Sequence, residues 1–124
     1  MNEGPIYKKS FEFSLKIIML YQQFSIKKEF VISKQLLRSA TSIGANVNEV
    51  SAAQTKKDFI AKMSIASKEA RETLYWLNLL QKSKLLEIDY QEYVLLCEEL
   101  VKILTAIVKT SQTQNNHSTL ITKN

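Results

Sequence analysis

Apolar residues recur three or four positions apart through most of the chain, which is the spacing of a helix with one buried face. The first such stretch predicts a helix from about Lys8 to Phe24. The second predicts a helix that begins between Ser25 and Ser33, either of which can cap it, and that ends near Ala53. The pattern leaves the start of this second helix open between those two serines.

The second half of the chain marks its helix starts more clearly. Thr55 followed by Asp58 is a capping box, and it opens a helix that ends near Ser83. Asp89 and Glu92 open the last helix in the same way. The apolar stripe of the third helix consists of Phe59, Met63, Ala66, Ala70, Thr73, Leu77 and Leu80. This heptad-like order predicts a helix that is buried along one face.

Only two glycines and one proline occur in the chain, so a many-stranded all-β fold is disfavoured. Four helices with short connections predict an all-α fold, an antiparallel up-down-up-down four-helix bundle over residues 8–111. A coiled coil is the alternative, but short connections fold sequential helices back on each other. We expect a loose N-terminus over residues 1–7, because Gly4-Pro5 cannot continue a helix. Residues 112–124 are rich in Ser, Thr, Gln and Asn and predict a disordered polar tail.

The second helix carries two different faces. One face is an apolar stripe typical of a bundle core, formed by Leu36, Ala40, Ile43, Val47 and Val50. The other face lies one position along and is mostly small or polar, with Leu37, Thr41, Gly44 and Asn48. We expect this second face to let another backbone or a polar partner approach closely.

The first helix has more apolar residues than one stripe requires. The stripe expected to face the bundle core consists of Phe11, Leu15, Ile18 and either Tyr21 or Leu20. The apolar residues left outside that stripe are Phe13, Ile17, Met19 and Phe24. A monomer would expose this second set as a large apolar patch. We therefore predict that Phe13, Ile17 and Phe24 lie in an oligomer interface.

Trp76 lies off the main stripe of the third helix, between Tyr75 and Leu77. Packing in the core is the first interpretation of this side chain. A subunit interface is the second, since interfaces are enriched in aromatic residues, and stacking on a nucleobase ranks last. Trp76 therefore joins the interface candidates.

The single cysteine, Cys97, lies among leucines on a periodic stretch, which predicts a buried apolar thiol rather than a nucleophile. A disulfide within the chain is impossible, which fits a reducing compartment. No run of residues approaches the ~20 apolar positions that cross a bilayer. We therefore expect a soluble cytoplasmic protein with no membrane partner.

The net charge of +5 is unevenly distributed. Residues 1–62 carry ten basic and five acidic side chains, whereas residues 63–124 carry seven of each. Most of the basic residues in the first half fall near predicted helix ends, where they can form a patch for phosphates. The nucleic-acid-binding candidates are Lys27, Lys28, Lys34, Lys56, Lys57 and Lys62. A solubilising surface is the plainer interpretation of the same charges.

Residues that would carry enzyme chemistry are scarce. His117 is the only histidine and lies in the predicted tail, so neither a catalytic triad nor a multi-histidine metal site can form within one chain. No glycine-rich phosphate loop and no Glu-x-x-His pair occurs. Glu69 and Glu72 share a helix face, but nothing nearby supplies a nucleophile or metal ligands. We predict no enzyme activity, no metal and no cofactor.

A structural role for these charges is more consistent with the predicted hairpin of the second and third helices. If the chain turns near residues 53–54, Arg38 faces the region of Glu69, and Glu49 lies beside Lys62. Such pairs set the register of two helices more than they add stability, because desolvation offsets much of the Coulomb attraction. The structural charge candidates are Arg38, Glu49, Glu69, Arg71 and Glu72.

Three motifs in order resemble one known family. They are Arg38-Ser39-Ala40-Thr41-Ser42-Ile43-Gly44-Ala45-Asn46-Val47 with Glu49, then Lys57-Asp58-Phe59, and then Lys68-Glu69-Ala70-Arg71-Glu72-Thr73 with Tyr75-Trp76-Leu77. Together they resemble the bacterial four-helix-bundle family of 23S rRNA intervening-sequence proteins, also called S23-type, over about Phe11 to Thr110. Many relatives have proline at the position of Gly44 and glycine at that of Val50, so the sharp helix kink of those relatives is not expected here.

The resemblance implies an all-α bundle that assembles as a ring-like homopentamer. Members of the family are encoded within insertions of large-subunit rRNA genes or stand free in genomes. The related accessory variability determinant proteins of diversity-generating retroelements work with a reverse transcriptase and bind nucleic acid. The resemblance implies no enzymatic activity.

Two hypotheses for function follow. The first is a non-catalytic oligomeric scaffold that binds RNA or DNA, because five copies of a +5 chain carry about +25 and repeat each phosphate contact around a ring. The second is a protein-interaction hub, such as a partner of a polymerase or reverse transcriptase, with the charge serving solubility. No base-reading motif separates RNA from DNA.

Overall fold

Four α-helices and one short 3₁₀ helix make up the fold in the computed structural model, which describes the backbone of residues 4–123 and the side-chain surroundings of residues 4–114. In chain order they are α1 (Pro5–Ile26), α2 (Ile32–Glu49), η1 (Val50–Ala52), α3 (Lys56–Ser83) and α4 (Gln91–Lys123). Residues 4–123 contain no strand. The prediction of an all-α fold is confirmed.

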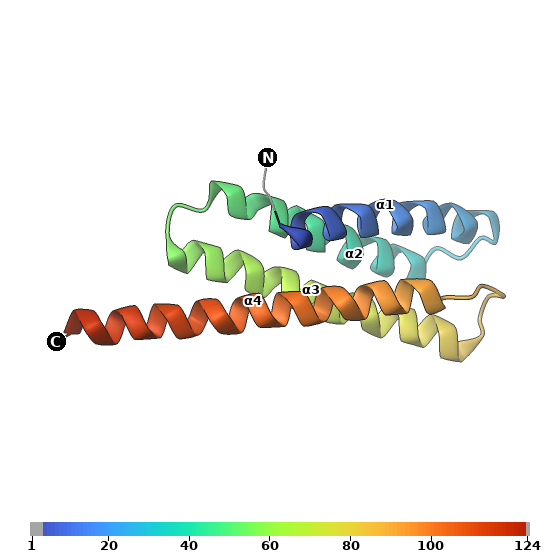
Figure 1. The fold of residues 1–124 in the computed structure, drawn as a ribbon. Coiled ribbons are helices and arrows are strands. Elements are labelled where there is room, and N and C mark those ends of the chain that lie inside the picture. Colours follow the sequence, from blue (N-terminus) through green and yellow to red (C-terminus); the bar gives the residue numbers. More distant parts are fainter. Residues whose placement is uncertain (1–3, 124) are drawn as a thin grey trace.

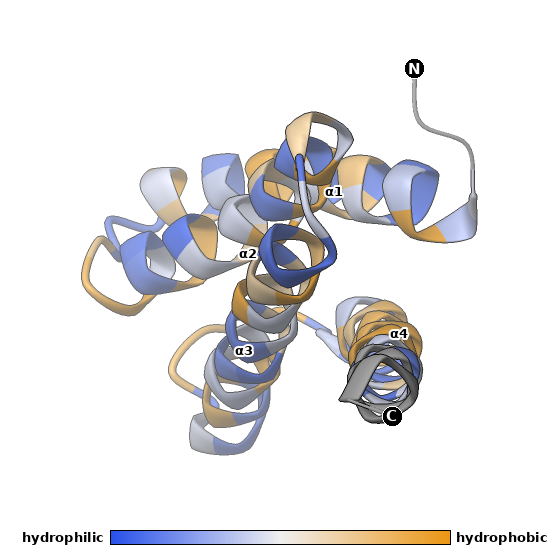
Figure 2. Ribbon diagram, turned by 90° about the vertical axis from the view of Figure 1, so that its left-hand side faces the viewer, coloured by the Kyte–Doolittle hydropathy of each residue, from blue (hydrophilic) through white to orange (hydrophobic). Residues whose placement is uncertain are grey.

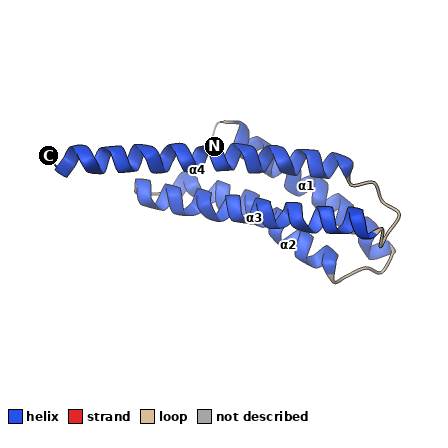
Figure 3. Cartoon of the chain, turned by 90° about the horizontal axis from the view of Figure 1, so that it is seen from below, coloured by secondary structure: helices blue, strands red, loops and turns tan. Residues whose placement is uncertain are grey.

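The helices pack as a bundle in which each one contacts its neighbours in sequence, and α1 also contacts α4. Short connections join them, so consecutive helices run in opposite directions (Figure 1). Seen from below, α3 and α4 lie side by side with α1 and α2 behind them (Figure 3). This arrangement agrees with the predicted up-down-up-down four-helix bundle.

Both predicted ends of the bundle are corrected by the structure. The first helix begins at Pro5 within the stretch expected to be loose, because proline lacks only an N–H that the first helical turn leaves unpaired anyway. Residues 1–3 lie outside the described residues. At the other end, α4 continues to Lys123 through the stretch expected to be disordered (Figure 1).

The extension of α4 has a local explanation. Residues 112–123 contain no glycine or proline to stop a helix that is already formed, and each polar residue costs only a fraction of a kcal/mol, up to about 0.7, relative to alanine. Ser111, where the change in composition begins, is itself buried. Asn124 and the side chain of His117 lie outside the described residues.

The inward face of α1 differs from the one expected, although Leu20 is buried and Met19 is exposed as predicted. Phe13, Ile17 and Phe24 are no more than 2% exposed, whereas Phe11 and Leu15 are 60% and 48% exposed. The two stripes have the same helical spacing, so sequence periodicity does not distinguish them. Phe13, Ile17 and Phe24 are core residues of the protomer, and their assignment to an oligomer interface is wrong.

Helices α2 and α3 bury the predicted faces. On α2 the predicted core stripe, Leu36 to Val50, is 0% to 6% exposed. On α3 the stripe from Met63 to Leu80 is buried, and Phe59 is partly buried at its start. Hydrophobic and hydrophilic residues accordingly alternate along each helix (Figure 2). The core therefore runs the length of the bundle.

At Gly44 the small face of α2 is approached by α1 of the same chain, whereas Asn48 on the same face is exposed. At Gly44 an added Cβ would lie 3.2 Å from Ser14 Oγ and 3.4 Å from the backbone oxygen of Ser10. This is the close backbone approach that the small residues predicted, and the approaching backbone belongs to α1. Gly44 therefore serves the packing of two adjacent helices.

The start of α2 depends on a residue that the sequence did not single out. The carboxylate of Glu29 accepts hydrogen bonds from the backbone N–H groups of Val31, Ile32 and Ser33, at 3.2, 3.0 and 2.8 Å. Ser33 Oγ donates in return to the backbone oxygen of Glu29 at 2.8 Å. The helix therefore begins near the later of the two predicted positions, but Glu29 is the capping side chain.

Candidate functional site

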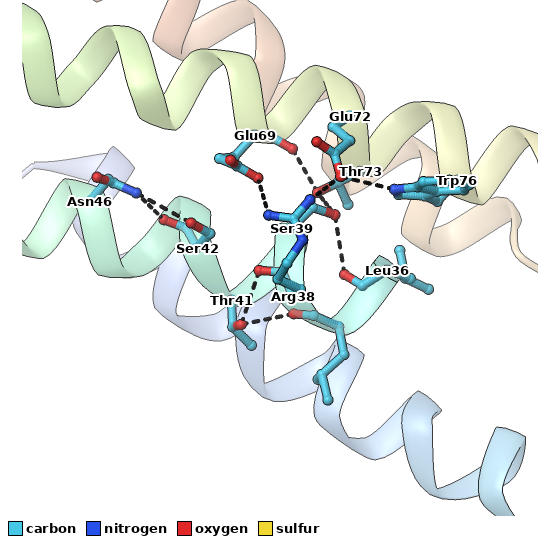
Figure 4. A network of polar contacts seen from close by, with 11 residues as sticks. Leu36, Arg38, Ser39, Thr41, Ser42, Asn46, Glu69, Glu72, Thr73 and Trp76 are labelled. Carbon is cyan, nitrogen blue, oxygen red and sulfur yellow. Dashed lines mark hydrogen bonds and ion pairs between the residues drawn. The ribbon is translucent and has the colours of Figure 1, made fainter. Parts of the chain in front are cut away.

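A polar network joins α2 to α3 around Arg38 (Figure 4). Arg38 Nη1 donates to Glu69 Oε2 at 3.2 Å, and Nη2 donates to Glu72 Oε2. Trp76 Nε1 donates to the same Glu72 oxygen at 3.1 Å. The predicted pairing of Arg38 with the region of Glu69 is confirmed, and Glu72 links the guanidinium to the indole.

Two buried hydroxyls lie beneath this network. The oxygens of Ser39 and Thr73 are 2.9 Å apart, and both residues are 0% exposed (Figure 4). Thr73 Oγ1 is also 2.7 Å from the backbone oxygen of Glu69, which places the hydroxyl pair directly beside the charged cluster. A sliding of α2 along α3 would break both sets of contacts, so the network sets the register of this helix pair.

The electrostatics of the network favour the charged form of Glu72. The hydrogen bond from Trp76 lowers the pKa of Glu72, burial opposes this, and the hydrogen bond and charge of Arg38 add to it. A general acid needs a raised pKa, and a general base needs a free oxygen close to substrate. The pair Glu69 and Glu72 is instead occupied by Arg38, so the geometry supports a structural role.

The remaining predicted charge pairs have mixed outcomes. Lys62 Nζ lies 2.5 Å from Glu49 Oε2, which confirms that pair and leaves Lys62 less available to a phosphate. Arg71 makes no ion pair with the residues whose side chains are described, and its Nη2 donates to Thr105 Oγ1 at 3.1 Å on α4. The assignment of Arg71 to a structural charge pair is therefore corrected.

Two ion pairs between α1 and α4 were missed. Lys9 Nζ lies 2.9 Å from Glu99 Oε1, and Lys16 Nζ lies 2.7 Å from Glu92 Oε1. All four groups are more than 40% exposed, so these pairs contribute little stability. Lys9 and Lys16 are seven positions apart, as are Glu92 and Glu99. This matching spacing is a sequence signal for the two ion pairs, but it is informative only once α1 is known to lie against α4.

The predicted phosphate-binding lysines divide between opposite ends of the bundle. Lys27, Lys28 and Lys34 surround the turn from α1 to α2, whereas Lys56 and Lys57 open α3 beyond the far end of α2 (Figure 1). The 18 residues of α2 separate the groups by about 27 Å. A single chain therefore presents two separate groups of candidate lysines. At the second end, Lys56 Nζ donates to Gln114 Oε1 at 3.1 Å.

The side of α1 that faces away from the core is strongly apolar. The members of this α1 outer face are Phe11, Leu15, Ile18, Met19 and Ile26, with exposed fractions of 60%, 48%, 44%, 66% and 81%. Phe30 and Val31 extend it into the following turn at 45% and 77% exposed. Such a group of exposed large apolar side chains on one helix is typical of a surface that another molecule covers.

Aromatic side chains mark a second exposed region on α3. Tyr75 is 59% exposed and meets Trp76 edge to face, with ring centroids 5.1 Å apart. Trp76 is only partly buried, and its N–H is already paired with Glu72. The Trp76 ring packs partly against the bundle core, in agreement with the first interpretation of this side chain.

Within residues 4–114 no group of three or more potential metal ligands comes together. Cys97 is fully buried and donates from Sγ to the backbone oxygen of Ala70 at 3.3 Å. Burial, with a smaller contribution from Glu98, raises the pKa of its thiol to about 12. None of the described helices combines the length and the hydropathy that a membrane span requires.

Comparison with known proteins was made by sequence and by structure. The model of the 23S rRNA-intervening sequence protein family matches residues 2–106. A similar crystal structure is that of a protein with unknown function from the S23 ribosomal protein family of Bacteroides thetaiotaomicron. It is 45% identical, the match covers 85% of this chain and 99% of that chain, and the TM-score is 0.79. No relative was found among the curated proteins.

Proposed function

Because this chain belongs to the family of 23S rRNA-intervening sequence proteins, we propose that it is a non-catalytic homo-oligomeric scaffold that associates with nucleic acid. The observation that carries the proposal is the α1 outer face, whose five large side chains are 44% to 81% exposed in the protomer. Covering them releases water from apolar surface, and each fully buried side chain of this size contributes roughly 1.5 to 3 kcal/mol. A second copy of the chain is the proposed cover.

A ring-like homopentamer is the proposed assembly, as the family resemblance implies. Five protomers with a net charge of +5 each carry about +25 in total. Each protomer contributes two groups of candidate lysines, so a ring repeats weak phosphate contacts and converts them into avidity. This supports structured RNA or DNA as the partner, and a cytoplasmic location is a further part of the proposal.

Light scattering behind a sizing column tests the assembly at micromolar concentration. A pentamer of the 14.3 kDa chain has a mass of five times that value, about 72 kDa. A folded monomer would overturn the proposed oligomer, whereas a stable dimer would overturn only the pentamer.

Binding to a structured RNA across a salt series tests the nucleic-acid association. The affinity should fall steeply as salt rises, because each phosphate contact releases counterions. An affinity that is insensitive to salt, or no binding near about 50 mM salt, would remove nucleic acid from the proposal.

A protein-interaction hub is the second candidate function, with a polymerase as the type of partner. The exposed Tyr75 beside the partly buried Trp76 favours it, because aromatic anchors dominate the energy of protein interfaces. The two candidates separate in the RNA experiment, since a hub whose charge serves only solubility shows no salt-dependent RNA binding.

A further inference from the structure

An open cleft of about 300 Å³ lies between α3 and α4. Its α3 wall consists of Ser64, Ser67, Lys68 and Arg71, and Val108 lines it from α4. The spacing of three, one and three places all four α3 side chains on one helix face. This α3–α4 cleft includes none of the lysines that charge patterning had selected.

The two serines of the cleft differ from most other hydroxyl residues in the helices. Ser14, Thr41 and Thr73 each donate to a backbone oxygen four positions earlier, which is the usual partner of a helical hydroxyl. Ser64 and Ser67 make no side-chain hydrogen bond to any residue from 4 to 114. Ser64 is partly exposed, Ser67 is 8% exposed, and both line the cleft, so their hydroxyls can donate to a ligand there.

The cations of the cleft are separated from the carboxylates that follow them in sequence. Glu69 and Glu72 turn towards α2, where Arg38 occupies them, while Lys68 and Arg71 line the side towards α4. Arg71 uses one N–H on Thr105 and keeps the rest of its five donors. Glu72 attracts Lys68 along the helix, and the charge of Lys68 in turn helps to lower the pKa of Glu72, after Trp76 and Arg38.

We propose that this α3–α4 cleft binds phosphate groups of a nucleic-acid backbone. A guanidinium, an ammonium and two hydroxyls are the side-chain donors that phosphate oxygens accept from, and Val108 supplies an apolar wall for a sugar. From Ser64 to Arg71 the helix rises about 10 Å, which is enough for neighbouring phosphates of one strand. The inference rests on the proposed nucleic-acid association and assigns its contact residues.

The test compares two variants that alter the cleft with one that does not. Lys68→Gln combined with Arg71→Gln removes both cations, and Ser64→Ala combined with Ser67→Ala removes both hydroxyls. Lys102→Gln is the charge control, because Lys102 is exposed on α4 and does not line the cleft. Binding of a single-stranded RNA oligonucleotide is measured across a salt series, and circular dichroism checks that each variant is folded.

The cation variant should bind RNA at least tenfold more weakly, and its salt slope should fall by about two. The serine variant should bind several-fold more weakly with an unchanged slope, and Lys102→Gln should resemble the parent. A cation variant no weaker than Lys102→Gln would overturn the cleft while leaving nucleic-acid binding intact. If the cation variant does not fold, the serine variant, which leaves the net charge unchanged, decides instead. A serine variant no weaker than Lys102→Gln would then overturn the cleft.

Inorganic pyrophosphate tests whether the cleft binds small phosphates rather than a nucleic-acid backbone. If the parent binds no RNA, the proposed function fails, and the cleft is then examined by titrating pyrophosphate into isotope-labelled protein. Pyrophosphate shifts of the Ser64, Ser67 and Thr105 amides that disappear in the cation variant would support a site for small phosphates. The absence of binding to both probes would overturn the cleft proposal.

Discussion

Glu29 holds the first turn of α2 through three backbone N–H groups, those of Val31, Ile32 and Ser33. Glu29→Gln should lower the free energy of unfolding by about 1 kcal/mol, because an amide oxygen accepts these bonds less strongly than a carboxylate and one oxygen is lost. Urea unfolding followed by circular dichroism measures the change. Glu87→Gln, in an exposed part of the α3–α4 connection, is the control and should match the parent.

The same carboxylate predicts a pH dependence. Burial acts to raise the pKa of Glu29, but the hydrogen bonds from Ser33, Ile32 and Val31 outweigh it, and the pKa lies below 4.5. A carboxyl whose folded pKa is depressed stabilises the protein above its unfolded pKa, and this contribution is lost as pH falls through the folded pKa. The difference between parent and Glu29→Gln should therefore shrink below about pH 4.5. A difference that stays constant down to pH 2 would contradict it.

Cys97 should be protected from thiol reagents in the folded protein. Its pKa is raised from 9.0 to about 12 by burial first and by Glu98 second, and its thiol is 0% exposed. At pH 8 the thiolate fraction is about a thousandfold lower than in an unfolded chain, and access requires opening of the core. Labelling with a chromogenic disulfide, with and without guanidinium, measures this. Equal rates in the two conditions would show that the thiol is accessible in the folded state.

The α1–α2 pair depends on the absence of a side chain at Gly44, which contacts Ser10 and Ser14 across the interface. Gly44→Leu should destabilise the bundle by about 1 to 3 kcal/mol, because overpacking outweighs the gain of up to about 1 kcal/mol in helix propensity. Thermal unfolding provides the measurement. Ala45→Leu is the matched control, since Ala45 is exposed one position along the same helix and should change stability little.

Helix pairing explains why the α2–α3 contacts were predictable and the α1–α4 contacts were not. A hairpin with a short turn sets which residues lie level with each other, and Arg38–Glu69 and Glu49–Lys62 both follow from that rule. The contact of α1 with α4 joins the two ends of the chain and depends on how all four helices close. Lys9 and Lys16 therefore acquire their partners only in the closed bundle.

At the scale of the molecule, substitutions at two neighbouring isoleucines on α1 test folding and association separately. Ile17 is 1% exposed and Ile18 is 44% exposed. Ile18→Asp should dissociate the proposed oligomer while keeping the helical circular dichroism of the parent, because a charge there is buried only when another copy covers it. Ile17→Asp should instead lose the folded signal, since an unpaired charge in the core costs several kcal/mol, about 3 to 5.

Light scattering and circular dichroism on both variants supply the two measurements. An Ile18→Asp protein with the mass of the parent oligomer would remove the α1 outer face from the proposed interface. A folded Ile17→Asp protein would contradict the assignment of the core face, so each variant tests a different statement about α1.

The sequence by itself determined the all-α class, the four helices, the capping box at Thr55 and the core stripes of α2 and α3, because these depend on residues close together in the chain or across a short hairpin. Only the tertiary structure decided which stripe of α1 faces inward, since both stripes repeat at the same spacing and only the closure of four helices selects one. The packing of the four helices also places the predicted lysines at two ends of the bundle, and it places Lys68 and Arg71 in a cleft with α4. These outcomes depend on residues far apart in sequence, and local periodicity contains no information about how such residues meet.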